Sequence, residues 1–304
     1  MKKVYCIGEL LIDLVSDNGE IYQKKPGGAP ANVAVTVSKL GGASYFLGQV
    51  GHDTFGTFLE NVLIQHQVKT RYMTKEGKTT LALVSIDESG ERDFEFYRGS
   101  DEAYQVKVST LNMDECTIVH FGSATVFLGG ELMNTTYEVL AEAVAKKAMI
   151  SFDPNYRDVL ISEEQLESYI QHCWNFMKNS DFIKLSDEEA MLLTKTSTFE
   201  EAVTYLKVSN LKTIAITLGK KGTLLIEGQD SIIIPSITIN QKDSTGAGDA
   251  FVGGVLYELS LNQKKSYKQI IEFANIVGAM TCEEYGAIPA IPSMEKVISK
   301  MNNL

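Results

Sequence analysis

Short apolar runs alternate with amphipathic segments along the C-terminal two thirds of the chain. Four of the apolar runs have the length of buried strands: 117–124, 148–155, 181–186 and 213–219. Three segments between them have the apolar spacing of helices: 131–147, 162–179 and 199–209. Strand–helix alternation of this kind predicts an α/β fold, with a mostly parallel central sheet and helices on both of its faces.

Two further runs, 222–227 and 231–236, follow the last of these strands with turn residues between them. They predict antiparallel strands at the edge of the sheet. The N-terminal segment MKKVYCIGELLIDLVSD predicts a first strand. We expect no signal peptide there, because Glu9 and Asp13 interrupt the apolar run and no small-residue cleavage site follows.

The first third of the chain has a different pattern. Residues 78–98 alternate apolar and polar side chains around a turn at Asp87–Gly90, which predicts a β-hairpin with one buried and one exposed face. Together with 14–25, this hairpin predicts a small sheet that projects from the α/β body. We expect a single domain over 1–304, into which a β-lid formed by roughly 14–25 and 70–104 is inserted. The alternatives are an extension of the main sheet or a dimer contact, and we expect a homodimer through the lid.

Composition excludes several classes of protein. The 304 residues are 44% hydrophobic and 22% charged, and the net charge is −11. An acidic chain without a basic run is a poor nucleic-acid binder. No uninterrupted apolar stretch is long enough to cross a membrane. Four scattered cysteines without a CxxC pair predict neither a zinc site nor a disulfide framework, and we expect a cytoplasmic protein.

The segment DSTGAGD at 243–249 carries the clearest chemistry. The apolar spacing of the residues that follow predicts a helix over 247–260. Gly246, Ala247 and Gly248 would then lie at its N-terminus, where unpaired N–H groups and the helix dipole favour a phosphate. Asp249 in the first turn could accept the proton of an attacking hydroxyl while the phosphate is transferred. The alternative is that Asp243 and Asp249 only cap the helix.

These residues resemble the ribokinase (PfkB) family of carbohydrate kinases, and within it the fructokinases. DSTGAGD is similar to the C-terminal signature of that family. GGAPANVA at 27–34, with LGG at 40–42 and GQVGHDTFG at 48–56, is similar to the N-terminal one. The motifs occur in family order from about residue 8 to 292. The resemblance implies a ribokinase-like fold, Asp249 as the catalytic base and the turn of Gly246, Ala247 and Gly248 as the anion hole.

The resemblance also implies the remaining site residues. Those on the sugar side are Asp13, Gly28, Asn32, Arg98 in FYRG and Arg157 in FDPNYR. Those on the ATP side are Lys184, Ser186, Glu189, Thr217, Gly219, Gly222, Asn275 and Gly286. Glu189 is expected to act on Mg²⁺ through water, and Ser186 stands where much of the family has Asn. Asp243 is the candidate for a monovalent cation, which would be K⁺.

The expected activity is transfer of the γ-phosphate of ATP to a primary hydroxyl of a small sugar, with fructose first. The alternatives within the family are kinases of 2-keto-3-deoxygluconate, ribose or aminoimidazole riboside. A different class is a non-catalytic sugar or nucleotide sensor on the same fold. Retention of Asp249, the glycine turn and Glu189 argues against a sensor, because a protein that only binds needs no base.

Overall fold

The computed structural model describes residues 1–16, 20–86, 92–261 and 263–303. Its strands are β1 (Lys3–Ile7), β2 (Leu11–Ser16), β3 (Gln23–Gly27), β4 (Ala43–Val50), β5 (Lys69–Lys75), β6 (Leu81–Ile86), β7 (Arg92–Tyr97), β8 (Thr117–Phe121), β9 (Met149–Phe152), β10 (Phe182–Ser186), β11 (Thr213–Thr217), β12 (Thr223–Glu227) and β13 (Asp230–Ile234). Its α-helices are α1 (Ala29–Lys39), α2 (Thr54–Gln65), α3 (Glu131–Ala145), α4 (Glu163–Asn179), α5 (Asp187–Thr194), α6 (Phe199–Val208), α7 (Ala247–Ser260), α8 (Tyr267–Thr281) and α9 (Met294–Met301).

Within the described residues, nine strands form the central sheet in the order β13-β12-β11-β10-β9-β8-β1-β4-β5. Neighbouring strands from β11 to β5 are parallel, whereas β12 and β13 pair antiparallel at one edge. The predicted parallel sheet and its antiparallel edge are therefore confirmed. The carboxyl ends of β8, β9, β10 and β11 meet at the same edge of the sheet, which is where ligands bind in folds of this kind.

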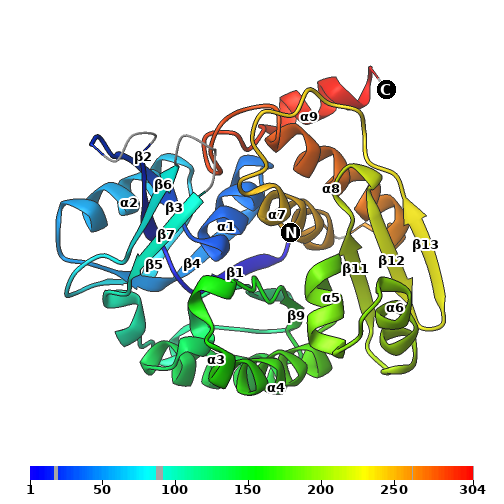
Figure 1. Ribbon diagram of the computed structural model, residues 1–304, viewed down its shortest axis with the longest axis horizontal. Coiled ribbons are helices and arrows are strands. Elements are labelled where there is room, and N and C mark those ends of the chain that lie inside the picture. Colours follow the sequence, from blue (N-terminus) through cyan, green and yellow to red (C-terminus); the bar gives the residue numbers. More distant parts are fainter. Residues whose placement is uncertain (17–19, 87–91, 262, 304) are drawn as a thin grey trace.

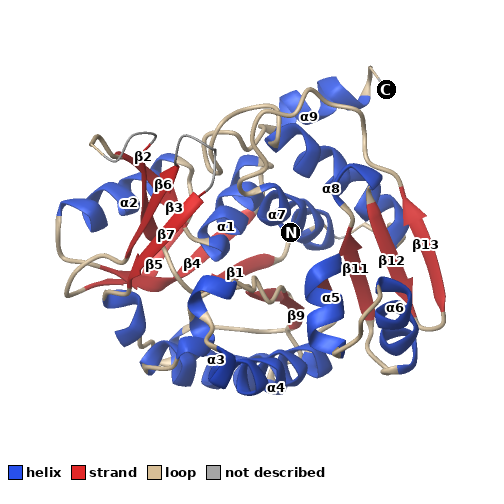
Figure 2. Ribbon diagram, viewed as in Figure 1, coloured by secondary structure: helices blue, strands red, loops and turns tan. Residues whose placement is uncertain are grey.

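Helices cover both faces of the central sheet, as predicted (Figures 1 and 2). Successive residues of β1 point to opposite faces. Val4 and Cys6 join the core shared with α1, α2, α7, α8 and α9. Tyr5 and Ile7 join the core shared with α3, α4, α5 and α6. Because the strands are buried on both faces, the sequence shows continuous apolar runs rather than alternation.

The small sheet has the order β3-β2-β6-β7 among the described residues. Strand β2 is parallel to β6, and β3 and β7 are antiparallel to their neighbours, so the starts of β2 and β6 lie beside the ends of β3 and β7. The predicted hairpin corresponds to β6 and β7, and its turn at Asp87–Gly90 lies outside the described residues. The expected lid range 70–104 needs one correction, because β5 pairs with β4 in the central sheet.

All four cysteines are free thiols: Cys6 and Cys173 are buried, Cys282 is half-buried and Cys116 is exposed. No helix in the described parts of the chain is long and apolar enough to cross a membrane.

Candidate active site

The turn before α7 has the conformation that the glycine-rich sequence predicts. Gly246 is the N-cap residue of α7 with φ 76°, and a Cβ there would lie 2.6 Å from the Cβ of Ala287. Only glycine fits such a position. The Ala247 N–H donates to the Ser244 carbonyl, while the amides of Gly246 and Gly248 donate to no group in the described part of the chain. Two of the three predicted N–H groups are thus available to an anion.

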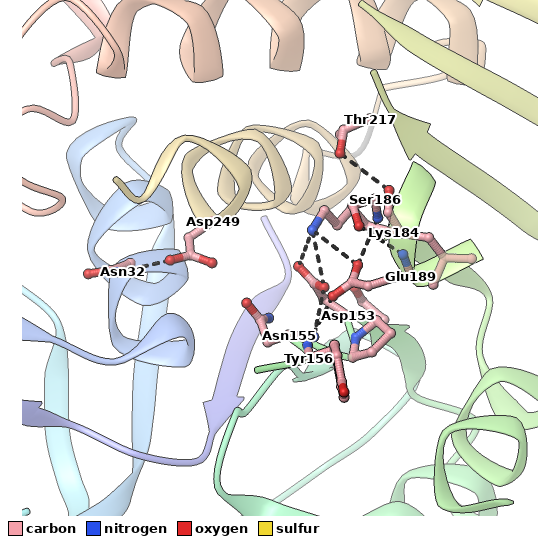
Figure 3. Close-up of polar contacts among 12 residues, drawn as sticks. Asn32, Asp153, Asn155, Tyr156, Lys184, Ser186, Glu189, Thr217 and Asp249 are labelled. Carbon is pink, nitrogen blue, oxygen red and sulfur yellow. Dashed lines mark hydrogen bonds and ion pairs between the residues drawn. The ribbon is translucent and has the colours of Figure 1, made fainter. Parts of the chain in front are cut away.

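Asp249 lies in the first turn of α7 with 8% of its surface exposed. Its Oδ2 accepts a hydrogen bond of 2.8 Å from Asn32 Nδ2 on α1, 217 positions earlier in the chain (Figure 3). Burial raises the pKa of Asp249, and Asn32, Arg157 and Lys184 partly oppose this rise. The carboxyl group is therefore oriented on one oxygen and has a greater proton affinity than an ordinary aspartate, which suits a general base.

Asn32 has a further acceptor beside this carboxylate. Its Oδ1 is buried and has no hydrogen-bond partner. A buried carbonyl oxygen without a partner is costly, so such an atom beside the predicted base indicates a ligand that donates to it. Gly28 precedes α1 with φ 114°, and a Cβ there would collide with the Glu9 carbonyl. This close approach positions α1 against the loop that follows β1.

Arg157 is an exposed residue of the loop that follows β9. Its guanidinium donates to the Tyr156 carbonyl at 2.8 Å, and its charge opposes the rise in pKa of both Asp13 and Asp249. Burial raises the pKa of Asp13, on β2, to about 6. The positive charge of Arg157 therefore acts on both carboxyl groups.

Arg98 has a different environment. Its Nη2 donates to the carbonyl oxygens of Thr125 at 3.2 Å and Gly129 at 2.9 Å, and its Nε lies 3.6 Å from Asp101 Oδ2. The guanidinium therefore fastens the end of β7 to the loop after β8. The role of Arg98 in sugar binding stays a prediction, and these contacts give it a structural role.

A second group of charges lies at the carboxyl ends of β9 and β10 (Figure 3). Lys184 Nζ lies 3.3 Å from Asp153 Oδ2 and 3.7 Å from Glu189 Oε2. Ser186 and Glu189 form a capping box at the start of α5, in which the Ser186 N–H donates to Glu189 Oε2 at 2.7 Å. Glu189 Oε1 also accepts from the Tyr156 N–H at 3.0 Å. Glu189 therefore joins the loop after β9 to α5.

Asp153 belongs to the motif FDPNYR but was not among the predicted site residues. Asp153 is 1% exposed, and burial raises its pKa to about 7, with Lys184 opposing the rise and Glu189 and Asp249 adding to it. A polar residue directly after a buried strand, next to a lysine on the adjacent parallel strand, was the signal that could have found it. Asn155 has a buried Nδ2 without a partner and was missed in the same way.

The other expected nucleotide residues lie at and after the end of β11, on α8 and in the loop that follows α8. Thr217 Oγ1 donates to the Leu185 carbonyl at 3.3 Å, and Gly219 and Gly222 bound the turn that follows β11. Asn275 accepts from Thr223 Oγ1 at 2.7 Å and donates to the Ile234 carbonyl at 3.1 Å. Both the oxygen and the nitrogen of its carboxamide therefore already make hydrogen bonds within the protein.

Asp243 connects two loops near the start of α7. Its Oδ2 accepts from the Gly286 N–H at 2.8 Å, and its Oδ1 accepts from the Thr245 N–H at 3.0 Å. Asp243 is not the cap of α7, because Gly246 is the N-cap residue and no side chain among the residues that the structure describes caps this helix; the Asp243 carboxylate stabilises the preceding turn instead. The same contacts hold the segment around Gly286 beside the glycine turn.

Comparison with known proteins identifies the class of this site. The family model "pfkB family carbohydrate kinase" matches residues 1–294. The chain belongs to the pfkB family of carbohydrate kinases. It is 35% identical to fructokinase-2 of Oryza sativa subsp. japonica, over 99% of this chain and 95% of the relative.

Solved structures agree with this result. The fructokinase of Vibrio cholerae O395, crystallised with fructose, ADP and a calcium ion, is 31% identical, and 98% of each chain aligns with a TM-score of 0.88. A double mutant of that fructokinase was solved with fructose, ADP and a potassium ion. The aminoimidazole riboside kinase of Salmonella enterica is 26% identical, covers 98% of this chain and 99% of its own, and has a TM-score of 0.85. The predicted family and ribokinase-like fold are confirmed.

Proposed function

We propose that this protein is an ATP-dependent fructokinase, which transfers the γ-phosphate of ATP to a primary hydroxyl of fructose. The observation that carries the proposal is the buried Asp249 carboxylate in the first turn of α7, which a hydrogen bond from Asn32 orients. Similarity to fructokinases over nearly the whole chain supports fructose as the substrate. Kinases of aminoimidazole riboside, 2-keto-3-deoxygluconate and ribose remain the alternatives that a substrate panel separates.

In this mechanism the sugar hydroxyl donates to Asp249, which accepts its proton as the phosphoryl group is transferred. The unpaired Oδ1 of Asn32 accepts from a neighbouring sugar hydroxyl, and Asp13 accepts from others. The free amides of Gly246 and Gly248 at the positive end of α7 stabilise the charge of the transferring group. Arg157 balances negative charge between Asp13 and Asp249.

The residues present fit a hydrated magnesium ion with the nucleotide. No group of three or more His, Cys, Asp or Glu side chains in the described residues is arranged to hold a metal by itself. Mg²⁺ bound with ATP needs only one or two carboxylates, because water and phosphate oxygens supply its other ligands. Glu189 would serve, acting through water, and the ion would neutralise phosphate charge. Asp243 is the proposed support of a K⁺ site.

The small sheet would act as a lid that keeps water from the transferring phosphate. We also propose a homodimer through the exposed face of this sheet, where Tyr97 is 55% exposed. Light scattering that gives the mass of one chain would contradict the dimer. The proposed location is the cytoplasm, in keeping with the unpaired cysteines.

The test is an ATP-dependent phosphorylation assay over fructose, 2-keto-3-deoxygluconate, ribose, aminoimidazole riboside, glucose and tagatose, with Mg²⁺ and with or without K⁺. We expect fructose to give the highest kcat/KM. Asp249→Asn should lower kcat by about a hundredfold to ten-thousandfold while ATP binding persists in calorimetry. Preference for another sugar would overturn the substrate, and unchanged turnover in Asp249→Asn would overturn the base. An inert wild type that binds ATP would favour the sensor.

A further inference from the structure

The ammonium group of Lys184 lies beside the turn that is proposed to bind phosphate. Lys184 is on β10 and is 7% exposed. A Cβ placed on Gly248 would lie 3.5 Å from Lys184 Nζ. The ammonium is therefore buried against the start of α7, next to the free amide of Gly248, where it adds a full positive charge to the partial charge of the helix end.

Three carboxylates keep this lysine charged. Burial lowers the pKa of Lys184, but Asp153, Glu189 and Asp249 raise it above its ordinary value. A lysine side chain is long and flexible, and its ammonium is a point charge without a preferred direction. Its position therefore depends on the groups that hold it.

The two carboxylates in contact with Lys184, those of Glu189 and Asp153, differ in their other hydrogen bonds. Both oxygens of Glu189 accept from backbone N–H groups, those of Tyr156 and Ser186, so Glu189 is held by the start of α5. The carboxylate of Asp153 has one weak contact with the backbone, in which the Asn155 N–H donates to Oδ1 at 3.3 Å. Its other contacts are with Lys184 Nζ, at 3.3 Å from both Oδ1 and Oδ2.

A carboxylate that is 1% exposed is expensive to bury, and its pairing with a lysine rarely repays that cost in stability. We propose that Asp153 is a positioning residue, which holds the Lys184 ammonium at the glycine turn so that it contacts the phosphoryl group during transfer. The inference rests on the proposed phosphoryl-transfer function. The competing explanation is that Asp153 only stabilises the fold.

The first experiment is a double-mutant cycle with Asp153→Asn and Lys184→Gln. Asp153→Asn keeps the shape of the side chain and an acceptor for Asn155, but it removes the charge that holds Lys184. We expect kcat to fall about tenfold to a hundredfold, the size of one charge-assisted hydrogen bond, with KM for ATP and sugar nearly unchanged. In the Lys184→Gln background the same change should have almost no further effect, because Asp153 acts through Lys184.

An equal fall of kcat in both backgrounds would overturn the proposal, as would an unchanged kcat in Asp153→Asn. The control is Glu188→Gln, which removes an exposed carboxylate at the start of α5 and should leave kcat unaltered. Measurements on the wild-type enzyme distinguish failure of the proposed substrate from failure of the proposed role of Asp153. If it prefers another sugar, the fructose assignment fails and the cycle is measured with that sugar. Absence of turnover with every sugar would overturn both.

A binding measurement tests the same idea if Lys184→Gln does not fold. Calorimetry would compare ADP alone with ADP, aluminium fluoride and the sugar, which together imitate the transferring phosphoryl group. Asp153→Asn should weaken the fluoride complex by the same factor as kcat and leave the affinity for ADP unaltered, because only the transition state needs the positioned ammonium. Equal weakening of both complexes would show a general loss of structure and contradict the proposal.

Discussion

Glu9 offers a test of how burial affects a carboxylate near the site. It follows β1 and is 1% exposed. Its Oε1 accepts from the Ala29 N–H at the start of α1 at 3.1 Å, and its Oε2 accepts from Ser123 Oγ. Burial raises the pKa of Glu9 from 4.5 to about 7, although the Ser123 hydrogen bond opposes this rise.

The sign of the effect on stability follows from linkage. Between pH 4.5 and pH 7 the folded protein holds a proton on Glu9 that the unfolded chain has lost. Stability from this group is therefore fully present below pH 4.5 and is lost as the pH rises through 7. Since each tenfold change in proton affinity corresponds to about 1.4 kcal/mol, the loss over the whole range is about 3 kcal/mol.

The assay is urea unfolding of the wild type and of Glu9→Gln at about pH 5 and about pH 8, the two sides of the range over which Glu9 loses its proton. Gln resembles the protonated acid and cannot ionise, so it should gain about 2 to 3 kcal/mol relative to wild type between these pH values. Asp13 and Asp153 also have raised pKa values, but they are common to both proteins and cancel in the difference. Equal pH dependence of the two proteins would refute the assignment of a raised pKa to Glu9.

Three other predictions concern the site. The kcat should fall as the pH is lowered, because the pKa of Asp249 is raised and its carboxylate therefore takes up a proton above the ordinary aspartate pKa of about 3.9. A kcat that stays constant down to about pH 3.9 would contradict this. Asn275→Ala should cost about 2 to 3 kcal/mol in urea unfolding, since it leaves the buried Thr223 hydroxyl without its partner. Ser186→Ala should cost about 1 kcal/mol by removing the helix cap, and Ser186→Thr, which keeps the hydroxyl, is its control.

The apolar pattern of the sequence predicted much of the fold. The spacing of Phe251, Val252, Val255 and Leu256 predicted the helix over 247–260 that the structure has as α7. The pattern could not assign β5, because this strand lies at the edge of the central sheet and its alternation is the same as that of a strand in a lid. Periodicity gives the face that a side chain occupies but not the sheet that the strand joins.

The sequence predicted those site residues whose position follows from a local backbone element. It predicted less well the residues whose role depends on contacts with side chains or carbonyl groups far away in the sequence. The glycine turn and Asp249 follow from the sequence of the helix start. The direction of Arg98 toward the loop after β8 depends on carbonyl groups that lie far away in the sequence. Glu9 and Asp153 were missed because a single acid after an apolar run shows its importance only once its partners are known.

The connections of the small sheet have a mechanical consequence. The starts of β2 and β6 and the ends of β3 and β7 lie in a row, so the sheet is attached to the body through four adjacent backbone segments. A plate held along one side resists twisting and sliding, and bending about the line of attachment is its softest motion. Since Asp13 is the third residue of β2, close to that line, a swing of the sheet moves this acid only a short way while the far end travels much further.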